Sequence, residues 1–167
     1  MKATLIINGK EFEVELTDEQ VEQIAPKKKT GYERVEEGNP YYMEHMNGSF
    51  SFAREDGIST DEDRWVYANY YSDAEVAANN ARADLLLRRL RRFAVDYRET
   101  PLDWNNANQK KFTIFYSQVH NDLSTDYANK YRQYGGIYFD TNEVALKAID
   151  TFREELMWYF KEYKDSL

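Results

Sequence analysis

Two copies of one block decide the fold of this chain: Tyr70-Tyr71-Ser72-Asp73-Ala74-Glu75-Val76-Ala77 and Tyr138-Phe139-Asp140-Thr141-Asn142-Glu143-Val144-Ala145. Tyrosine, glutamate, valine and alanine recur in register, and the second aromatic position changes from tyrosine to phenylalanine. Each copy is typical of an aromatic strand that runs into a helix. Ser72 or Asp140 is expected to cap the helix, and Glu75 or Glu143, three residues later, completes a capping box. The sequence therefore predicts a strand-then-helix unit that is used twice.

Two long helices and several hairpins are expected around these blocks. Apolar residues recur at helical period after each cap, and Pro101 ends the first helix near Glu99. Asn8-Gly9 and Asn47-Gly48 stand between alternating apolar runs, which favours two-residue hairpin turns. Further strands are expected at residues 64–70, 111–116 and 137–139. We therefore predict an α+β protein, with an antiparallel sheet built from hairpins and two long helices packed on one face.

The chain is predicted to have two parts. Residues 1–25 form a small ββα appendage, because a capping box at Thr17-Asp18-Glu19-Gln20 follows the first hairpin. Residues 30–167 form the main α+β domain, which contains the repeated strand-helix unit. A length of 167 residues suits one sizeable hydrophobic core.

Composition excludes several classes of function. With 30 acidic and 22 basic residues the net charge is -8, which argues against wholesale binding to nucleic acid or to an anionic membrane. The chain has no cysteine, so disulfides, thiolate zinc sites and cysteine nucleophiles are excluded. No stretch approaches the ~20 apolar residues of a membrane helix, and the apolar run near the N-terminus is too short for a secretory signal. We expect a cytoplasmic protein without a membrane partner.

Catalytic motifs are missing from the sequence. The two histidines, His45 and His120, have no second histidine at ligand spacing, and no phosphate-binding glycine loop or nucleophile elbow is present. We therefore predict no catalytic residue, no metal site and no cofactor, and we disfavour an enzyme. A site assembled from scattered carboxylates stays open, because spacing alone does not exclude it.

An acidic segment, predicted as a loop, carries five carboxylates between residues 55 and 63. They are Glu55, Asp56, Asp61, Glu62 and Asp63. One interpretation is an ordinary solvated loop. The other is a partner-binding surface that imitates the phosphates of nucleic acid and faces the basic groove of a nuclease, with Glu33, Glu36 and Glu37 nearby in sequence adding to it.

Two further surfaces are candidates on the predicted helices. Arg88, Arg89, Arg91 and Arg92 cover one broad face opposite the buried stripe, where they either track a phosphate backbone or pair with surplus carboxylates. Trp158 points away from the apolar stripe of the last helix. Either that helix is covered on two sides, or Trp158 forms an exposed aromatic anchor with Met157 and Tyr159.

Five segments that span nearly the whole chain carry a resemblance. They are Ile7–Val14, Gly31–Val35, Asn69-Tyr70-Tyr71 with Glu75 and Ala77, Asp103-Trp104-Asn105 with Asn108, Gln109 and Lys111, and Trp158-Tyr159-Phe160. They resemble a loose family of small acidic proteins carried by phages and mobile elements of Gram-positive bacteria, most of which have no assigned function. Such proteins often inhibit host defence, including anti-CRISPR proteins, so the resemblance implies a protein of the host bacterial cytosol. It carries over no functional residue.

The favoured function is a non-catalytic inhibitor that binds a host defence protein or nuclease complex, with its carboxylates imitating nucleic acid. The alternative is a phage accessory protein that binds nucleic acid through the arginine-rich helix, although the net charge disfavours direct binding. A small hydrolase or nuclease with a carboxylate-built site is the third hypothesis. Homo-oligomer formation stays open.

Overall fold

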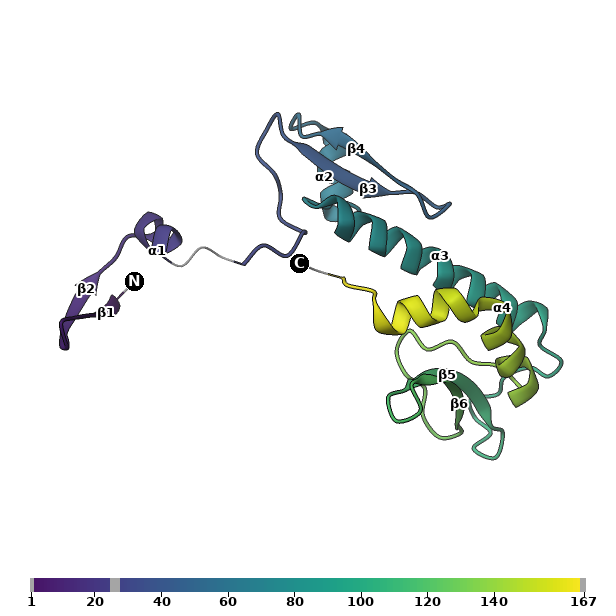
Figure 1. Ribbon diagram of the computed structural model, residues 1–167. Coiled ribbons are helices and arrows are strands. Elements are labelled where there is room, and N and C mark those ends of the chain that lie inside the picture. Colours follow the sequence, from purple (N-terminus) through teal and green to yellow (C-terminus); the bar gives the residue numbers. More distant parts are fainter. Residues whose placement is uncertain (1, 25–27, 166–167) are drawn as a thin grey trace. The chain divides into compact units, whose positions relative to one another are not determined.

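The structure is a computed structural model that describes residues 2–24 and 28–165 (Figure 1). The chain divides into two compact units, Met1–Thr30 and Gly31–Leu167. The smaller unit contains β1 (Lys2–Ile7), β2 (Lys10–Glu15) and α1 (Asp18–Ile24). The larger unit contains, in chain order, β3 (Pro40–Glu44), β4 (Phe50–Arg54), α2 (Ser59–Val66), α3 (Ala74–Asp96), β5 (Lys111–Ser117), β6 (Asp122–Ala128) and α4 (Asn142–Lys161).

The smaller unit has the predicted hairpin and helix. β1 and β2 pair antiparallel, and both turn residues, Asn8 and Gly9, have positive φ, as an Asn-Gly turn requires. The Thr17 N–H donates to Oε1 of Gln20 at 3.0 Å, and the Gln20 N–H donates to Oγ1 of Thr17 at 3.3 Å. This reciprocal pair is the predicted capping box at the start of α1. The predicted boundary at residue 25 lies outside the described residues.

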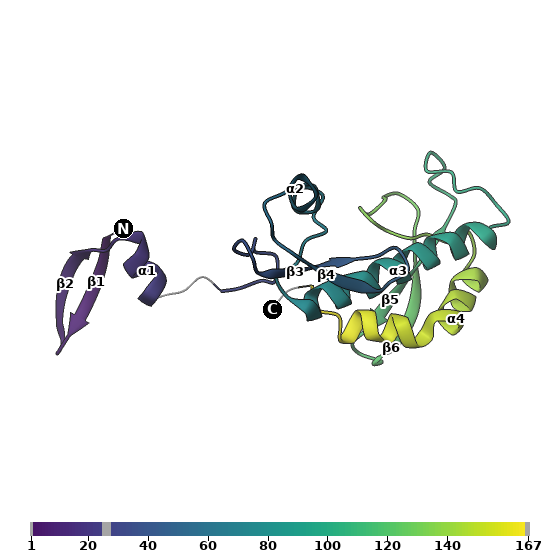
Figure 2. The same ribbon diagram turned by 90° about the horizontal axis from the view of Figure 1, so that it is seen from above.

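Helices α3 and α4 lie next to each other in the middle of the larger unit (Figures 1 and 2). Hairpin β3–β4 packs on α3, and hairpin β5–β6 packs on α4. The predicted α+β class, with antiparallel hairpins and two long helices, is confirmed. The strands do not join into one sheet, because the three hairpins remain separate two-stranded sheets.

The repeated block builds the same junction twice. Tyr71 forms an antiparallel bridge with Tyr42 of β3, and Phe139, at the matching position of the second copy, forms one with Phe112 of β5. Within each bridge both backbone N–H groups donate to the partner's carbonyl oxygen, at 2.8 to 2.9 Å. Since a helix begins three residues after each bridge, neither hairpin gains a full third strand.

The helix caps lie one residue later than predicted in both copies. Asp73 caps α3, because its Oδ1 accepts hydrogen bonds from the N–H groups of Glu75 and Val76 at 2.8 and 3.0 Å. Thr141 caps α4 by accepting from the N–H of Val144 at 3.2 Å. The predicted helix starts are therefore right to within two residues, while the predicted capping residues are wrong.

The side chains predicted as caps make longer-range contacts instead. The Ser72 hydroxyl donates to Oε2 of Glu33 at 2.9 Å. Oδ2 of Asp140 accepts from the N–H groups of Glu99 and Thr100 at 2.7 and 2.8 Å. Asp140 thus connects the second block to the segment that follows α3.

The main core lies between α3, α4 and hairpin β5–β6. It contains Leu86, Leu90, Phe93, Ala94, Leu123, Phe139, Ala145, Ala148, Ile149, Phe152 and Leu156. The predicted apolar stripes therefore face this core, although Tyr97 and Phe160 at their ends are exposed. A smaller cluster of Tyr41, Met43 and Tyr70 lies under hairpin β3–β4.

Two sequence predictions between residues 55 and 70 are wrong. The acidic segment is not a loop throughout, because Ser59–Val66 forms the helix α2, and no strand forms at residues 64–70. Oδ2 of Asp61 accepts from the N–H groups of Asp56 and Ile58, at 3.0 and 3.3 Å, and so fixes the first turn of α2. The helix ends where Ala68 adopts a positive φ of 55°.

Candidate functional site

Two of the five acidic-segment carboxylates lie inside the protein. Glu55 and Asp61 are only 3% and 2% exposed. Both oxygens of Glu55 accept from Arg34, whose Nε and Nη2 each lie 3.2 Å away, and Oε2 also accepts from the hydroxyl of Tyr70 at 2.7 Å. Oδ1 of Asp61 accepts from the hydroxyl of Tyr41 at 2.6 Å. The expectation that all five carboxylates form an exposed surface is therefore wrong for these two.

The buried network is tightly packed and shifts the pKa values of its members. The hydrogen bonds from Arg34 lower the pKa of Glu55, against the opposing effect of burial. The hydrogen bond from Tyr41 likewise lowers the pKa of Asp61, while burial raises the pKa values of Tyr41 and Tyr70. The two tyrosine rings stack with their centres 4.0 Å apart. Every carboxylate oxygen is engaged by a donor of the fold itself, which is the arrangement of a structural network.

The remaining carboxylates of the segment are exposed. Asp56 and Asp63 have no ion-pair partner among the described residues, whereas Glu62 accepts from Nη1 of Arg34 at 2.6 Å. The N–H of Gly38 donates to the carbonyl of Glu55 at 2.7 Å, and the N–H of Glu55 donates to the carbonyl of Asn39 at 3.0 Å. These bonds hold the segment that carries Glu36 and Glu37 beside Asp56.

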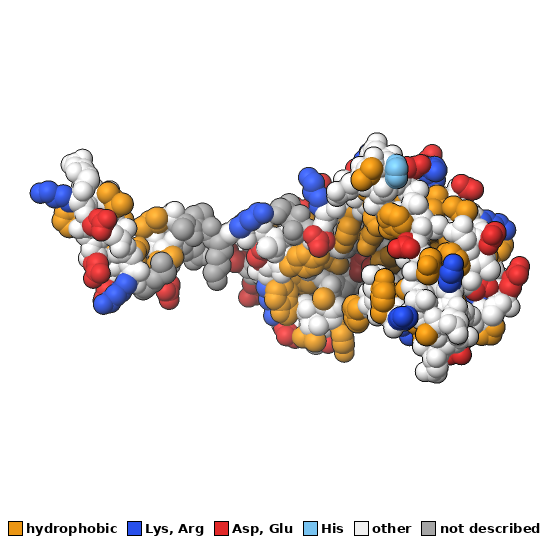
Figure 3. Space-filling view, turned by 90° about the horizontal axis from the view of Figure 1, so that it is seen from below, with side chains coloured by type: hydrophobic (Ala, Val, Ile, Leu, Met, Phe, Trp, Pro, Cys, Tyr) orange, Lys and Arg blue, Asp and Glu red, His pale blue; other side chains and the backbone are white. Residues whose placement is uncertain are grey.

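Exposed carboxylates therefore occur in this region, but they are not the five predicted from the sequence. We give the name acidic surface to four of them, which have no ion pair among the described residues: Glu36, Glu37, Asp56 and Asp63. Two exposed apolar side chains follow Asp63 in the sequence, Val66 at the end of α2 and Tyr67 just after it. Acidic side chains also border the hydrophobic ones on the face drawn in Figure 3.

Trp158 is a core residue and not an exposed anchor. It is 8% exposed, because the helix is covered on its second side by Arg82 of α3, whose guanidinium carbon lies 3.9 Å from the centre of the indole ring. The ring of Tyr163 lies 5.7 Å away, centre to centre. Met157 and Tyr159 are half-buried against the main core. The prediction that these three residues form an exposed aromatic anchor is therefore wrong. The alternative prediction, that the last helix is covered on two sides, is right.

The four arginines of the predicted nucleic-acid face make different contacts. Nη2 of Arg88 donates to the carbonyl of Met46 at 3.0 Å, and Nη1 of Arg89 donates to Glu155 at 2.9 Å. Arg92 pairs with Asp96 on the same helix at 3.4 Å. Arg91 lines a cavity at the C-terminal end of α3. The four side chains therefore have different partners and do not form one continuous surface for a single ligand.

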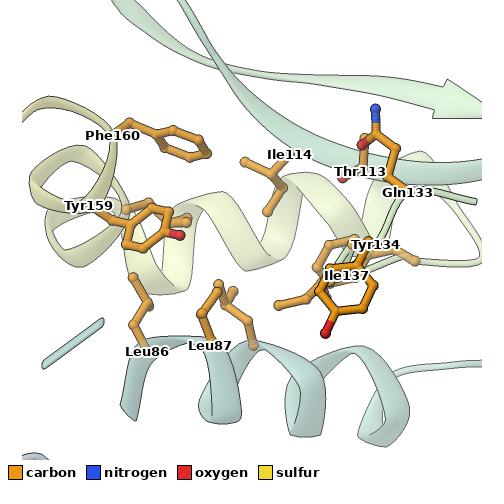
Figure 4. Close-up of a pocket in the computed structure, with 14 residues that line it drawn as sticks. Leu86, Leu87, Thr113, Ile114, Gln133, Tyr134, Ile137, Tyr159 and Phe160 are labelled. Atoms are coloured by element: carbon orange, nitrogen blue, oxygen red, sulfur yellow. The ribbon is translucent and has the colours of Figure 1, made fainter. Parts of the chain in front are cut away.

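The largest of the three described cavities is an apolar groove of about 320 Å³. Figure 4 shows Leu86 and Leu87 on α3 facing Tyr159 and Phe160 on α4, with Ile114 above them and Ile137 at the far side. The lining contains no acidic, basic or histidine side chain. Such a groove can hold an apolar group, but it offers no acid–base pair for catalysis.

A second cavity, of about 220 Å³, was not predicted from the sequence. It brings Arg91 of α3 together with Arg98, which follows the helix, and with Arg132, beside the rings of Trp104 and Tyr138. Nε of Arg98 is buried and has no hydrogen-bond partner within residues 2–24 and 28–165. Nothing in the sequence indicates this cavity, because Arg132 is more than 30 residues from Arg91 and Arg98 along the chain.

No metal site or membrane span is found in the described part of the chain. Within residues 2–24 and 28–165, no group of three or more His, Cys, Asp or Glu side chains is placed to hold a metal ion. Over the same ranges, no helix combines the length and the apolar character needed to cross a bilayer. His45 contacts the hydroxyl of Ser51 at 2.8 Å, within hairpin β3–β4.

Comparison of the chain with protein-family models, with curated proteins and with solved structures gave no match.

Proposed function

We propose that this protein is a non-catalytic inhibitor that binds a basic groove of a bacterial defence nuclease complex through its acidic surface. The observation that supports this proposal is the set of exposed carboxylates at Glu36, Glu37, Asp56 and Asp63, which lack ion-pair partners among the described residues. Carboxylates left unpaired on a protein surface attract a basic partner and raise its association rate.

The apolar side chains of the same region give the interface a second component. Val66 and Tyr67 are well exposed, and aromatic side chains that lose water on binding contribute much of the energy of protein interfaces. A bare nucleic-acid strand would be repelled by the carboxylates. A basic groove on a protein would pair with the carboxylates and would also remove the apolar side chains from water.

A capture experiment with matched charge reversals tests the proposal. The tagged protein is incubated with bacterial lysate at low salt, and bound nucleases are identified by mass spectrometry after elution with duplex DNA. The test variant is Glu36→Lys, Asp56→Lys and Asp63→Lys. The control variant places the same change of charge on exposed residues of α4 and its C-cap: Asp150→Lys, Glu154→Lys and Glu162→Lys.

The wild type and the α4 control should capture a nuclease complex that duplex DNA displaces, and the test variant should not. Equal capture by both variants would overturn the proposal, as would a captured partner that DNA does not displace.

A further inference from the structure

Three arginine side chains line the cavity at the C-terminal end of α3. Arg91 lies in the last turns of the helix, Arg98 follows the helix C-cap Tyr97, and Arg132 comes from the loop that precedes Gly135-Gly136. The cavity shares only Gly136 and Ile137 with the apolar groove of Figure 4. It is therefore a separate site with a different chemistry.

None of these arginines has an ion-pair partner among residues 2–24 and 28–165. By contrast, Arg34, Arg64, Arg89, Arg92 and Arg153 each pair with a carboxylate. The buried Nε of Arg98 has no acceptor among the described residues. An anion in the cavity would balance the positive charges of the three arginines that line it.

Aromatic and apolar side chains form the wall of the same cavity. The rings of Trp104 and Tyr138 meet edge to face, with their centres 4.8 Å apart. The guanidinium carbon of Arg132 lies 5.5 Å from the centre of the Trp104 ring. Leu102 and Ile137 add apolar surface. A ligand that fits this cavity therefore has a flat, weakly polar body next to its anionic group.

The two loops that carry these side chains are held in place. The buried Nζ of Lys111 donates to the carbonyl of Asn106 at 2.9 Å, and Oε1 of Gln109 accepts from the N–H of Asp103 at 2.7 Å, which fixes the loop around Trp104. The hydroxyl of Tyr138 accepts from the N–H of Gln133 at 2.8 Å, next to Arg132. The site is thus pre-organised, which lowers the entropic cost of binding.

We propose that this cavity binds a nucleotide, with the phosphate held by Arg91, Arg98 and Arg132 and the base against the Trp104 and Tyr138 wall. Guanidinium groups match the geometry of phosphate oxygens, and bases stack readily on aromatic rings and on arginine. The nucleotide is either free or one unit of a single strand, since both present the same chemistry. This inference is independent of the proposed inhibitor function.

Isothermal titration calorimetry at low ionic strength tests the assignment on the full chain. The probes are inorganic phosphate, adenosine monophosphate and a short single-stranded oligodeoxythymidylate. The variants are Arg98→Gln and Arg132→Gln. Arg92→Gln is the matched control, because it removes the same charge from an arginine next to Arg91 in the sequence, but Arg92 does not line the cavity. Thermal unfolding shows that each variant is folded.

We expect the mononucleotide, the oligonucleotide or both to bind, with affinity about tenfold weaker in each cavity variant and within about twofold of wild type in the control. Binding of the mononucleotide alone identifies a free nucleotide as the ligand, and binding of the oligonucleotide alone identifies a single strand. The proposal is overturned if neither binds, if the control loses as much affinity as the cavity variants, or if phosphate alone binds as tightly as the nucleotides.

Discussion

Arg34 and Glu55 form a two-point ion pair, in which Nε and Nη2 of the arginine each lie 3.2 Å from a different carboxylate oxygen. Glu55 is buried, and Tyr70 and the N–H of Gly57 supply its other donors. A carboxylate held in this way serves the fold and is not available to a partner. The pair therefore separates the acidic residues that stabilise the protein from those that are free to bind.

Replacing Glu55 tests this separation directly. Glu55→Gln keeps the shape of the side chain but removes the charge that Arg34 and Tyr70 engage, so the free energy of unfolding should fall by about 2 kcal/mol. Asp63→Asn, at an exposed position, should change it by less than about 0.5 kcal/mol. Urea denaturation measures both. Equal effects of the two substitutions would show that Glu55 is as solvated as Asp63.

The lowered pKa values of Glu55 and Asp61 predict a specific loss of stability in acid. Both carboxyl groups bind a proton less readily in the folded chain than in the unfolded one. Their contribution to stability is complete above the ordinary carboxyl pKa of about 4 and is lost as the pH falls through the lowered native values. Urea midpoints between about pH 6 and about pH 2 should therefore fall more steeply for the wild type than for Glu55→Gln. Parallel profiles would contradict this account.

The position of Trp158 under Arg82 predicts a large effect on folding. Trp158→Ala should lower the free energy of unfolding by about 3 kcal/mol or more, because it leaves a cavity between α3 and α4. Arg82→Gln removes only the cation–π contact and should cost about 1 kcal/mol or less. Chemical denaturation checks both values. A small effect of Trp158→Ala would contradict the buried position of Trp158 and would support an exposed side chain that binds a partner.

Two adjacent glycines should respond differently to substitution. A Cβ on Gly136 would lie 2.7 Å from the ring of Tyr138, which is buried and whose hydroxyl accepts a hydrogen bond from the Gln133 N–H, so Gly136→Ala should cost about 1 to 3 kcal/mol. Gly135 has open space around it and a φ of 73°, which asparagine tolerates, so Gly135→Asn should cost less than about 1 kcal/mol. Thermal unfolding of the two variants should rank them in this order. The reverse order would contradict the close contact between Gly136 and the ring of Tyr138.

The helices and hairpins could be predicted because their signals are local. The apolar stripes of α3 and α4 and the Asn8-Gly9 turn depend on residues that are close in sequence. The caps were misplaced by one residue, since Ser72 and Asp73 are both good capping residues and sequence does not rank them. Helix α2 was missed because the segment has the composition of a solvated acidic loop. Nothing near Asp61 in the sequence indicates that this aspartate is buried and fixes the start of a helix.

The candidate sites could be predicted only in part, because they depend on residues that are distant in sequence. The partner of Glu55 is Arg34, 21 residues away, so nothing near the acidic segment indicates that this carboxylate is buried. The cavity arginines come from α3, from the segment just after it and from a loop beyond β6, and only the fold brings Arg132 to the other two. By contrast, Asp56 and Asp63 belonged to the predicted acidic set and are indeed exposed.

The most direct test of the central claim is the rate of DNA cleavage by the captured nuclease, measured with increasing amounts of this protein. The account predicts that the wild type slows cleavage, that higher salt or more substrate DNA relieves the inhibition, and that Glu36→Lys with Asp56→Lys and Asp63→Lys abolishes it. Inhibition that persists unchanged in this variant, or that is insensitive to salt and to DNA, would contradict the claim that exposed carboxylates occupy the nucleic-acid groove.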